Sequence, residues 1–157
     1  MKIGFIGFGE AAYNISLGLK GEGVTGIIAY DKMAGDPVMG PMVAGRAAEA
    51  EAALLDTAKE VAEQADVIFG AVPSSFALDV CYEIKDVLCE GKIYADVSAS
   101  TPAVKEKIWE AVRDTGVKFV DAAMLGSLPK DKHQVPITAS GNGADTLKEM
   151  MTPYGMK

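Results

Sequence analysis

The sequence predicts an α/β protein in which a doubly wound, mostly parallel sheet carries helices on both of its faces. Two observations lead to this fold class. Short β-rich runs alternate with helical stretches along the whole chain. A glycine-rich turn also separates the first apolar run, 2–7, from the first helical stretch. The 157 residues suffice for one compact domain, 1–157, and are too few for two typical ones.

Each expected strand is a short run of apolar and β-branched residues between turn signals. Pro73 closes the clearest buried run, 65–72. The segment 32–41 is rich in Gly, Pro and Met and is expected to be a loop. The expected strands are 2–7, 26–31, a short one near 54–55, 65–72, 92–97, 118–124 and 135–140.

The expected helices are bounded by capping and stop signals. Thr57 and Glu60 have the spacing of a capping box, Pro102 suits a first helical turn, and Gly116 is a stop signal. The expected helices are 10–20, 42–53, one that opens at Thr57, 76–88, 102–114 and one that begins near Ala144.

Composition narrows the function classes. The formal charge is −7, and the few Lys and Arg residues are scattered, which argues against a nucleic-acid surface. No run approaches the ~20 apolar residues of a membrane span, and no signal peptide is expected, so we expect a cytoplasmic protein. No metal site is expected. Cys81 and Cys89 lie eight residues apart along one expected amphipathic helix, with Cys89 at its C-terminal end, and are predicted to be buried free thiols.

The chemistry-bearing motif is Gly7-Phe8-Gly9-Glu10-Ala11-Ala12, a G-x-G-x-x-A loop between the first strand and the first helix. Gly7 permits the tight turn, Gly9 lets a pyrophosphate approach the backbone, and Ala12 lets the helix pack against the sheet. Phosphates would then lie at the helix N-terminus, where free N–H groups favour negative charge. This is the loop of a Rossmann-type dinucleotide-binding domain.

Asp31 supports a dinucleotide as the ligand. It lies 22 residues after Gly9, at the end of the second strand. A carboxylate at that place can accept hydrogen bonds from ribose hydroxyls. Because a carboxylate repels a 2′-phosphate, NAD is expected over NADP, although Lys32 beside it softens that preference. Glu10 is expected to turn toward solvent.

Flavin and S-adenosylmethionine sites share parts of this pattern. Methyltransferases of this fold usually carry an acidic residue just ahead of the glycines, whereas residues 3–6 here are apolar or Gly. A methyltransferase is therefore a less favoured alternative.

Beyond the loop, the sequence resembles the β-hydroxyacid dehydrogenase family, whose members include 6-phosphogluconate dehydrogenase and 3-hydroxyisobutyrate dehydrogenase. The resemblance covers nearly the whole chain and looks closest to the 6-phosphogluconate dehydrogenase-like subgroup. It implies that Val72, Pro73 and Ser74 border the adenosine and ribose, and that Ser98 lies by the nicotinamide. The matching segments are 4–12, 66–73, 96–102, 121–127 and 136–141.

The chain also departs from the family pattern. At the substrate motif, Leu125 stands where the family has serine and Ser127 where it has its final glycine, and only Gly126 is kept. Leu125, Gly126 and Ser127 are thus weak substrate-binding candidates, with Ser127 as a displaced hydroxyl. The family's catalytic Lys and Asn, and its C-terminal helical domain, lie beyond the equivalent of this chain. No catalytic residue is therefore assigned.

These observations predict the NAD(P)-binding domain of an oxidoreductase that acts on the hydroxyl group of a small hydroxyacid. The domain is expected to be inactive alone, for lack of the catalytic helical domain. The alternative is a stand-alone NAD-binding regulatory module, or one that pairs with a partner. In either case, an uncovered apolar face could support a homo-oligomer.

Overall fold

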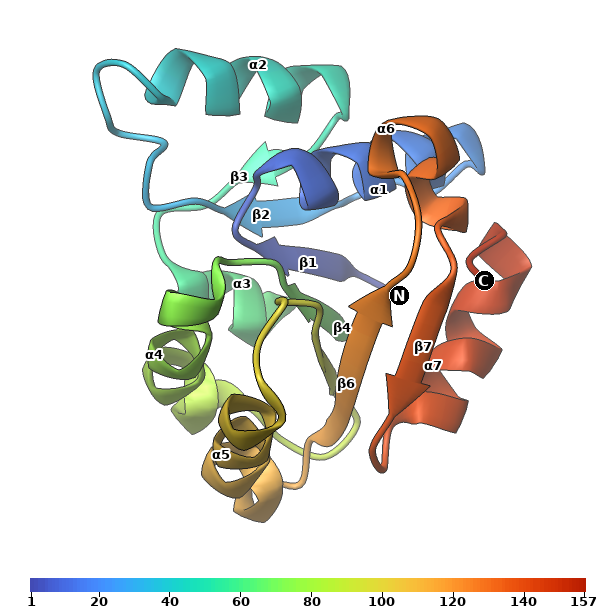
Figure 1. The fold of residues 1–157 in the computed structure, drawn as a ribbon. Helices are drawn as coiled ribbons and strands as arrows, with labels where there is room; N and C mark the ends of the chain where they lie inside the picture. Colours follow the sequence, from blue (N-terminus) through green and yellow to red (C-terminus); the bar gives the residue numbers. More distant parts are fainter.

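The computed structural model describes residues 1–157 and contains a seven-stranded sheet with the order β3-β2-β1-β4-β5-β6-β7 (Figure 1). All neighbouring strands are parallel except β6 and β7, which are antiparallel. The predicted doubly wound, mostly parallel sheet is confirmed. The strands are β1 (Ile3–Ile6), β2 (Ile28–Tyr30), β3 (Ala53–Leu54), β4 (Val67–Gly70), β5 (Ile93–Asp96), β6 (Lys118–Met124) and β7 (Ile137–Ser140).

The helices fall close to their expected places. Thr57 caps its helix by accepting a hydrogen bond from the Glu60 amide, and Thr101 caps the helix that begins at Pro102. The helices are α1 (Glu10–Gly21), α2 (Gly40–Glu49), α3 (Ala58–Gln64), α4 (Ser74–Ile84), α5 (Pro102–Val112), α6 (Leu128–Asp131) and α7 (Ala144–Met151).

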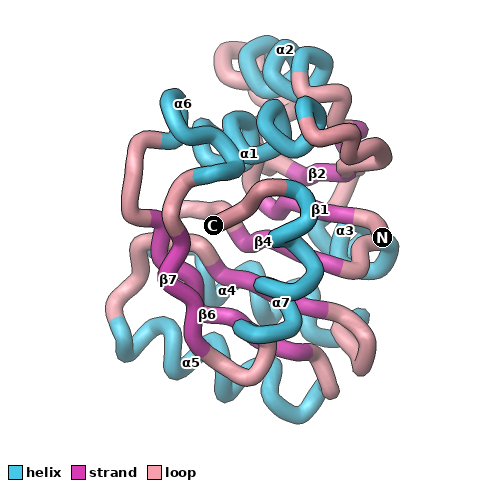
Figure 2. The backbone as a smooth tube through the Cα atoms, turned by 90° about the vertical axis from the view of Figure 1, so that its right-hand side faces the viewer, coloured by secondary structure: helices cyan, strands magenta, loops and turns pink.

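Helices cover both faces of the sheet because alternate residues of each strand point to opposite sides. Phe5 faces a core that includes Leu19 of α1 and Leu147 of α7. Its neighbour Ile6 faces a second core, shared with residues of α3, α4 and α5 such as Ile84. Figure 1 shows α3, α4 and α5 on one side of the sheet, and Figure 2 shows α1 and α7 on the other.

The connection from β6 to β7 is folded and carries Lys130, Lys132 and His133. It forms α6 and a 3₁₀ turn over 132–134 that pack against α1. His133 is buried, and its Nε2 lies 3.3 Å from the Glu22 carboxylate. A Cβ on Gly18 would overlap the His133 ring, so the absence of a side chain there allows the packing.

The helical prediction for residues 76–88 was wrong at its end, and this separates the two cysteines. Helix α4 stops at Ile84, a 3₁₀ turn follows over 85–87, and Leu88 is extended. Cys81 is buried as expected, whereas Cys89 is exposed because it lies beyond the helix. Among the helices, none has the length and apolar character that crossing a membrane requires.

Candidate cofactor site

The glycine loop leaves β1 where the strand order reverses, between β1 and β4. Gly7 has a φ of +90°, and a Cβ there would overlap the carbonyl oxygen of Ala71 after β4. Its amide donates to the Tyr30 carbonyl at the end of β2, at 2.7 Å. Only glycine satisfies both the backbone conformation and the close approach. The loop therefore lies at the crevice where open α/β sheets bind ligands.

Gly9 fits the role predicted for a phosphate-binding glycine. A Cβ at Gly9 would have no atom within 4 Å, so the space beside the backbone is open. Gly9 is also the N-cap of α1, and no side chain caps that helix. The first amides of α1 therefore lack a protein acceptor and can take phosphate oxygens.

The other loop residues divide between core and solvent. Phe8 is fully buried and meets Phe5 edge-on at 6.3 Å between ring centroids, so only its backbone borders the loop. Ala12 is fully buried in the same core, as its small size predicted. Ala11 is half-buried, and Glu10 is exposed in the first turn, where the helix dipole favours a negative charge.

Asp31 holds the loop from the side of β2. Its Oδ2 accepts a hydrogen bond from the Phe8 amide, and its Oδ1 accepts one from the Met33 amide, both at 2.8 Å. A carboxylate offers about four lone-pair positions, so two remain for ribose hydroxyls. Burial, followed by the charges of Glu83 and Asp31, raises the pKa of Tyr30, which therefore stays neutral beside Asp31.

The segments after β2 and β4 meet across the crevice. The Lys32 ammonium lies 4.1 Å from the centroid of the Phe76 ring, which is 41% exposed. Val72 borders Gly7, while Pro73 and Ser74 are exposed at the start of α4. The structure thus brings the residues predicted to border the adenosine half of the cofactor to one edge of the sheet.

A buried charge cluster at the end of β5 was missed by the sequence reasoning. The Lys105 ammonium of α5 contacts Asp96 Oδ2 at 2.8 Å, Asp121 Oδ1 at 2.9 Å and the Asp96 carbonyl oxygen at 2.9 Å. Ser98, predicted near the nicotinamide, is buried against this cluster and bonds Asp96 at 2.8 Å and Ser100 at 2.6 Å. The available signal was the position of Lys105, on the same helix face as the buried Ile108.

The weak substrate candidates follow β6. Leu125 is 64% exposed, and Gly126 packs against the Asp131 carboxylate. Ser127 is the N-cap residue before α6; its amide donates to Asp131 Oδ2 at 3.1 Å, and its hydroxyl has no partner in the protein. Of the three, Ser127 has the only side chain that can bind a polar substrate.

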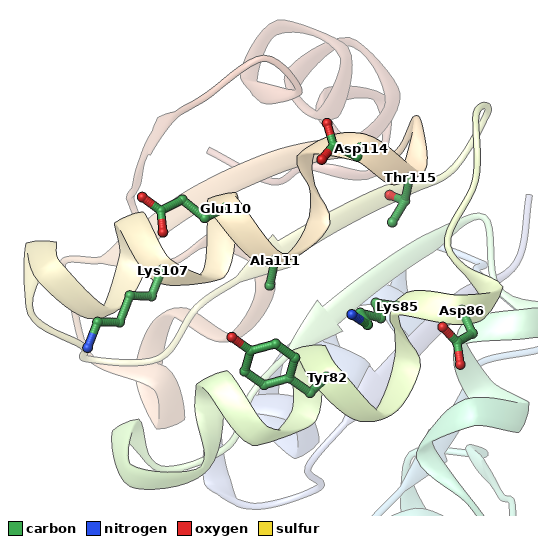
Figure 3. A pocket seen from close by; sticks show the side chains of 8 residues that line it. All are labelled: Tyr82, Lys85, Asp86, Lys107, Glu110, Ala111, Asp114 and Thr115. Atoms are coloured by element: carbon green, nitrogen blue, oxygen red, sulfur yellow. The ribbon is translucent and has the colours of Figure 1, made fainter.

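A separate groove of about 470 Å³ lies between the last turns of α4 and α5 (Figure 3). Charges of both signs line it, with Lys85 and Asp86 on one side and Lys107 and Glu110 on the other. The glycine loop faces the first turn of α4, so this groove is distinct from the cofactor site.

Comparison with known proteins agrees with this geometry. The model of the family described as the NAD binding domain of 6-phosphogluconate dehydrogenase matches residues 2–155. The 2-(hydroxymethyl)glutarate dehydrogenase of Eubacterium barkeri is 28% identical over 130 residues, which is 80% of this chain and 40% of that protein.

Solved structures share the whole fold. A conserved hypothetical protein from Sinorhizobium meliloti 1021 has a TM-score of 0.92 and 30% identity, over 100% of this chain and 52% of that one. The conserved protein MTH1747, described as structurally similar to 3-hydroxyacid dehydrogenases, has a TM-score of 0.84 and 25% identity. The match covers 100% of this chain and 56% of that one. The chain spans about half the length of the relatives it matches.

Proposed function

The chain belongs to the family of the NAD binding domain of 6-phosphogluconate dehydrogenase, and we propose that it holds the cofactor of an oxidoreductase acting on the hydroxyl group of a small hydroxyacid. One observation carries the proposal. The open space beside Gly9, at an uncapped helix N-terminus, adjoins the Asp31 carboxylate through the Phe8 amide. A pyrophosphate and a ribose are the groups that this pairing accommodates.

The cofactor proposed is NAD rather than NADP. The Asp31 carboxylate would accept hydrogen bonds from two ribose hydroxyls, whereas a 2′-phosphate in the same place would meet a like charge. Lys32 supplies a nearby positive charge, but its ammonium lies over the Phe76 ring. We therefore expect weaker binding of NADP rather than its exclusion.

Each part of the site has a role in holding the reactants. A bound nicotinamide dinucleotide supplies the hydride chemistry. The first amides of α1 would donate hydrogen bonds to the pyrophosphate, Asp31 would accept them from the ribose, and the end of β5 would receive the nicotinamide half. The free hydroxyl of Ser127 is the proposed contact for a substrate carboxylate.

We further propose that residues 1–157 bind the cofactor without turning over a hydroxyacid. Oxidation of a hydroxyl needs a group that accepts its proton. The Lys105 ammonium lies at the end of β5, but all three of its N–H groups already have acceptors in Asp96 and Asp121. His133 is buried against α1 beside Gly18.

Thermal unfolding with NAD, NADP and S-adenosylmethionine tests the proposal. A ligand present at about 100 times its dissociation constant adds ~2.7 kcal/mol, or roughly 5–10 °C for a domain of this size. We expect the largest shift with NAD, a smaller one with NADP and none with S-adenosylmethionine. The Asp86→Asn variant in the separate groove should retain all of these shifts.

Two results would count against the proposal. A shift with S-adenosylmethionine alone would favour a methyltransferase. If no ligand shifts the unfolding temperature, and calorimetric titration with millimolar NAD shows no heat of binding, then the glycine loop has only a structural role. Steady oxidation of a 3-hydroxyacid by residues 1–157 would refute only the claim that this domain lacks turnover.

A further inference from the structure

The buried cluster at the end of β5 forms a chain of hydrogen bonds that leads outward. Lys105 is 7% exposed and Asp96 fully buried, and the ammonium of Lys105 touches one carboxylate oxygen of Asp96. The same oxygen accepts from Ser98, and Ser98 bonds Ser100, which is half-buried. The chain thus runs from the core to the carboxyl edge of the sheet.

The direction of every bond in this chain is determined. An ammonium only donates, and a carboxylate paired with it is ionised and only accepts. Ser98 must therefore donate its single hydroxyl proton to Asp96. Because that proton is used, the 2.6 Å bond between Ser98 and Ser100 must run from the Ser100 hydroxyl to the Ser98 oxygen. Ser100 is left with lone pairs and no free proton, so it can only accept.

The place of this acceptor follows from the sheet order. A dinucleotide bound across the point between β1 and β4 puts its halves on opposite sides of it. Asp31 marks the adenosine side, beyond β2, and residues 98–100 follow β5 on the other side. The half expected there is nicotinamide, whose carboxamide carries an NH₂ donor. This step rests on the proposed function.

We propose that Ser100 accepts a hydrogen bond from the nicotinamide carboxamide NH₂, and that Lys105, Asp96 and Ser98 are positioning residues that hold it as an acceptor. The arrangement selects cofactors whose ring substituent donates at this point. It also fixes which way the carboxamide turns, because reversing the group would place its carbonyl oxygen against the Ser100 lone pairs.

Three ligands test the acceptor role by calorimetric titration. NAD carries the NH₂ group, the 3-acetylpyridine analogue of NAD replaces it with a methyl group, and ADP-ribose lacks the ring. In Ser100→Ala, the affinity for NAD should fall about three- to tenfold, as expected for one neutral hydrogen bond. The affinities for the acetylpyridine analogue and ADP-ribose should stay within about twofold. Thr25→Ala, at an exposed position before β2, is the control and should change none of the three affinities.

Ser98→Ala tests the positioning role while leaving the Lys105–Asp96 pair intact. The freed Ser100 hydroxyl could then also donate, so the preference for NAD over the acetylpyridine analogue should narrow while ADP-ribose affinity is unchanged. A purely structural role would weaken all three ligands equally.

The outcomes separate the two proposals. Failure of the unmodified chain to bind ADP-ribose or NAD would overturn the proposed function. If ADP-ribose binds normally, the present inference would be overturned by either of two results. In one, Ser100→Ala leaves the affinity for NAD unchanged; in the other, it weakens the binding of NAD and of the acetylpyridine analogue equally. An unchanged ligand preference in Ser98→Ala would overturn the positioning role.

Discussion

The Phe8 amide donates a 2.8 Å hydrogen bond to Asp31 Oδ2, and this bond joins the turn after β1 to the end of β2. Asp31 therefore holds the glycine loop in place without a bound ligand. Its second oxygen accepts from Met33, so one carboxylate sets the relative position of two segments that border the crevice.

Replacing Asp31 should change both stability and cofactor preference. Asp31→Asn keeps one acceptor oxygen but turns an NH₂ toward an amide donor, which should cost about 1–3 kcal/mol in the free energy of unfolding. Loss of the negative charge should shift the ratio of the NAD and NADP dissociation constants toward NADP by roughly tenfold, or ~1.4 kcal/mol. Urea unfolding and calorimetric titration measure the two effects. Asp36→Asn, in the same connection, should leave the ratio unchanged.

The two loop glycines should respond differently to alanine. Gly7→Ala places a side chain at positive φ and against the Ala71 carbonyl, so it should lower stability by about 1–3 kcal/mol from backbone strain alone. Gly9→Ala meets no atom of the protein and should cost less than about 1 kcal/mol.

Gly9→Ala should have a large effect on NAD binding although its effect on stability is small. A methyl group in the space beside its backbone should weaken NAD binding at least tenfold in a domain that still unfolds cooperatively. Full NAD affinity in Gly9→Ala would mean that the pyrophosphate does not approach this backbone.

Lys105 should be far more important to stability than its helical neighbour Lys107. Lys105→Met leaves the buried Asp96 and the half-exposed Asp121 without their cation, and breaking a buried pair typically costs about 3–5 kcal/mol. Lys107 is exposed on the same helix, so Lys107→Met should change the unfolding free energy by less than about 0.5 kcal/mol. Equal effects in chemical denaturation would contradict the buried pairing.

The two cysteines should differ in reactivity. Burial, more than any other cause, raises the pKa of Cys81 to about 12, whereas Cys89 is exposed. Iodoacetamide at pH 8 should modify one thiol in the native chain and two after denaturation, because the thiolate is the reactive form. Mass spectrometry of the peptides should place the native label on Cys89, and a native label on Cys81 would show that the core opens readily.

The raised pKa of Cys81 also predicts a pH dependence of stability. Its value in the unfolded chain is near 9.0, so its contribution is complete below pH 9 and is lost as the pH rises from 9 toward 12. Burial also raises the pKa of Tyr94, which acts in the same direction. The urea midpoint should therefore fall above pH 9, and less steeply in Cys81→Ala than in Cys89→Ala.

The sequence predicted those parts of the fold whose causes are local. The G-x-G-x-x-A turn, the Thr57 cap and Pro102 act within a few residues, and each marks an element boundary close to the observed one. Helix α6 spans only Leu128–Asp131, which is too short to show a helical period, and its stability comes from packing on α1. Cys89 was misplaced because no local signal ended α4 at Ile84.

The site was predictable in its glycine loop and less so at β5. Ser98 was identified through family resemblance, but the charge pair behind it depends on contacts between strands and α5. Lys105 nevertheless lies three residues before Ile108 and seven before Val112, on the buried face of that helix. A lysine on an apolar stripe was the signal for a buried carboxylate partner, and the acidic end of strand 92–97 was its natural candidate.

The packing of His133 into the space left by Gly18 sets an order of events during protein synthesis. Glu22 and His133 are 111 positions apart, so the surface of the first helix stays incomplete until most of the chain has been translated. Chains emerge at about 5–20 residues per second, which leaves that surface uncovered for several seconds on the ribosome. Nascent chains that stop short of His133 should therefore leave the face of α1 around Gly18 exposed to solvent.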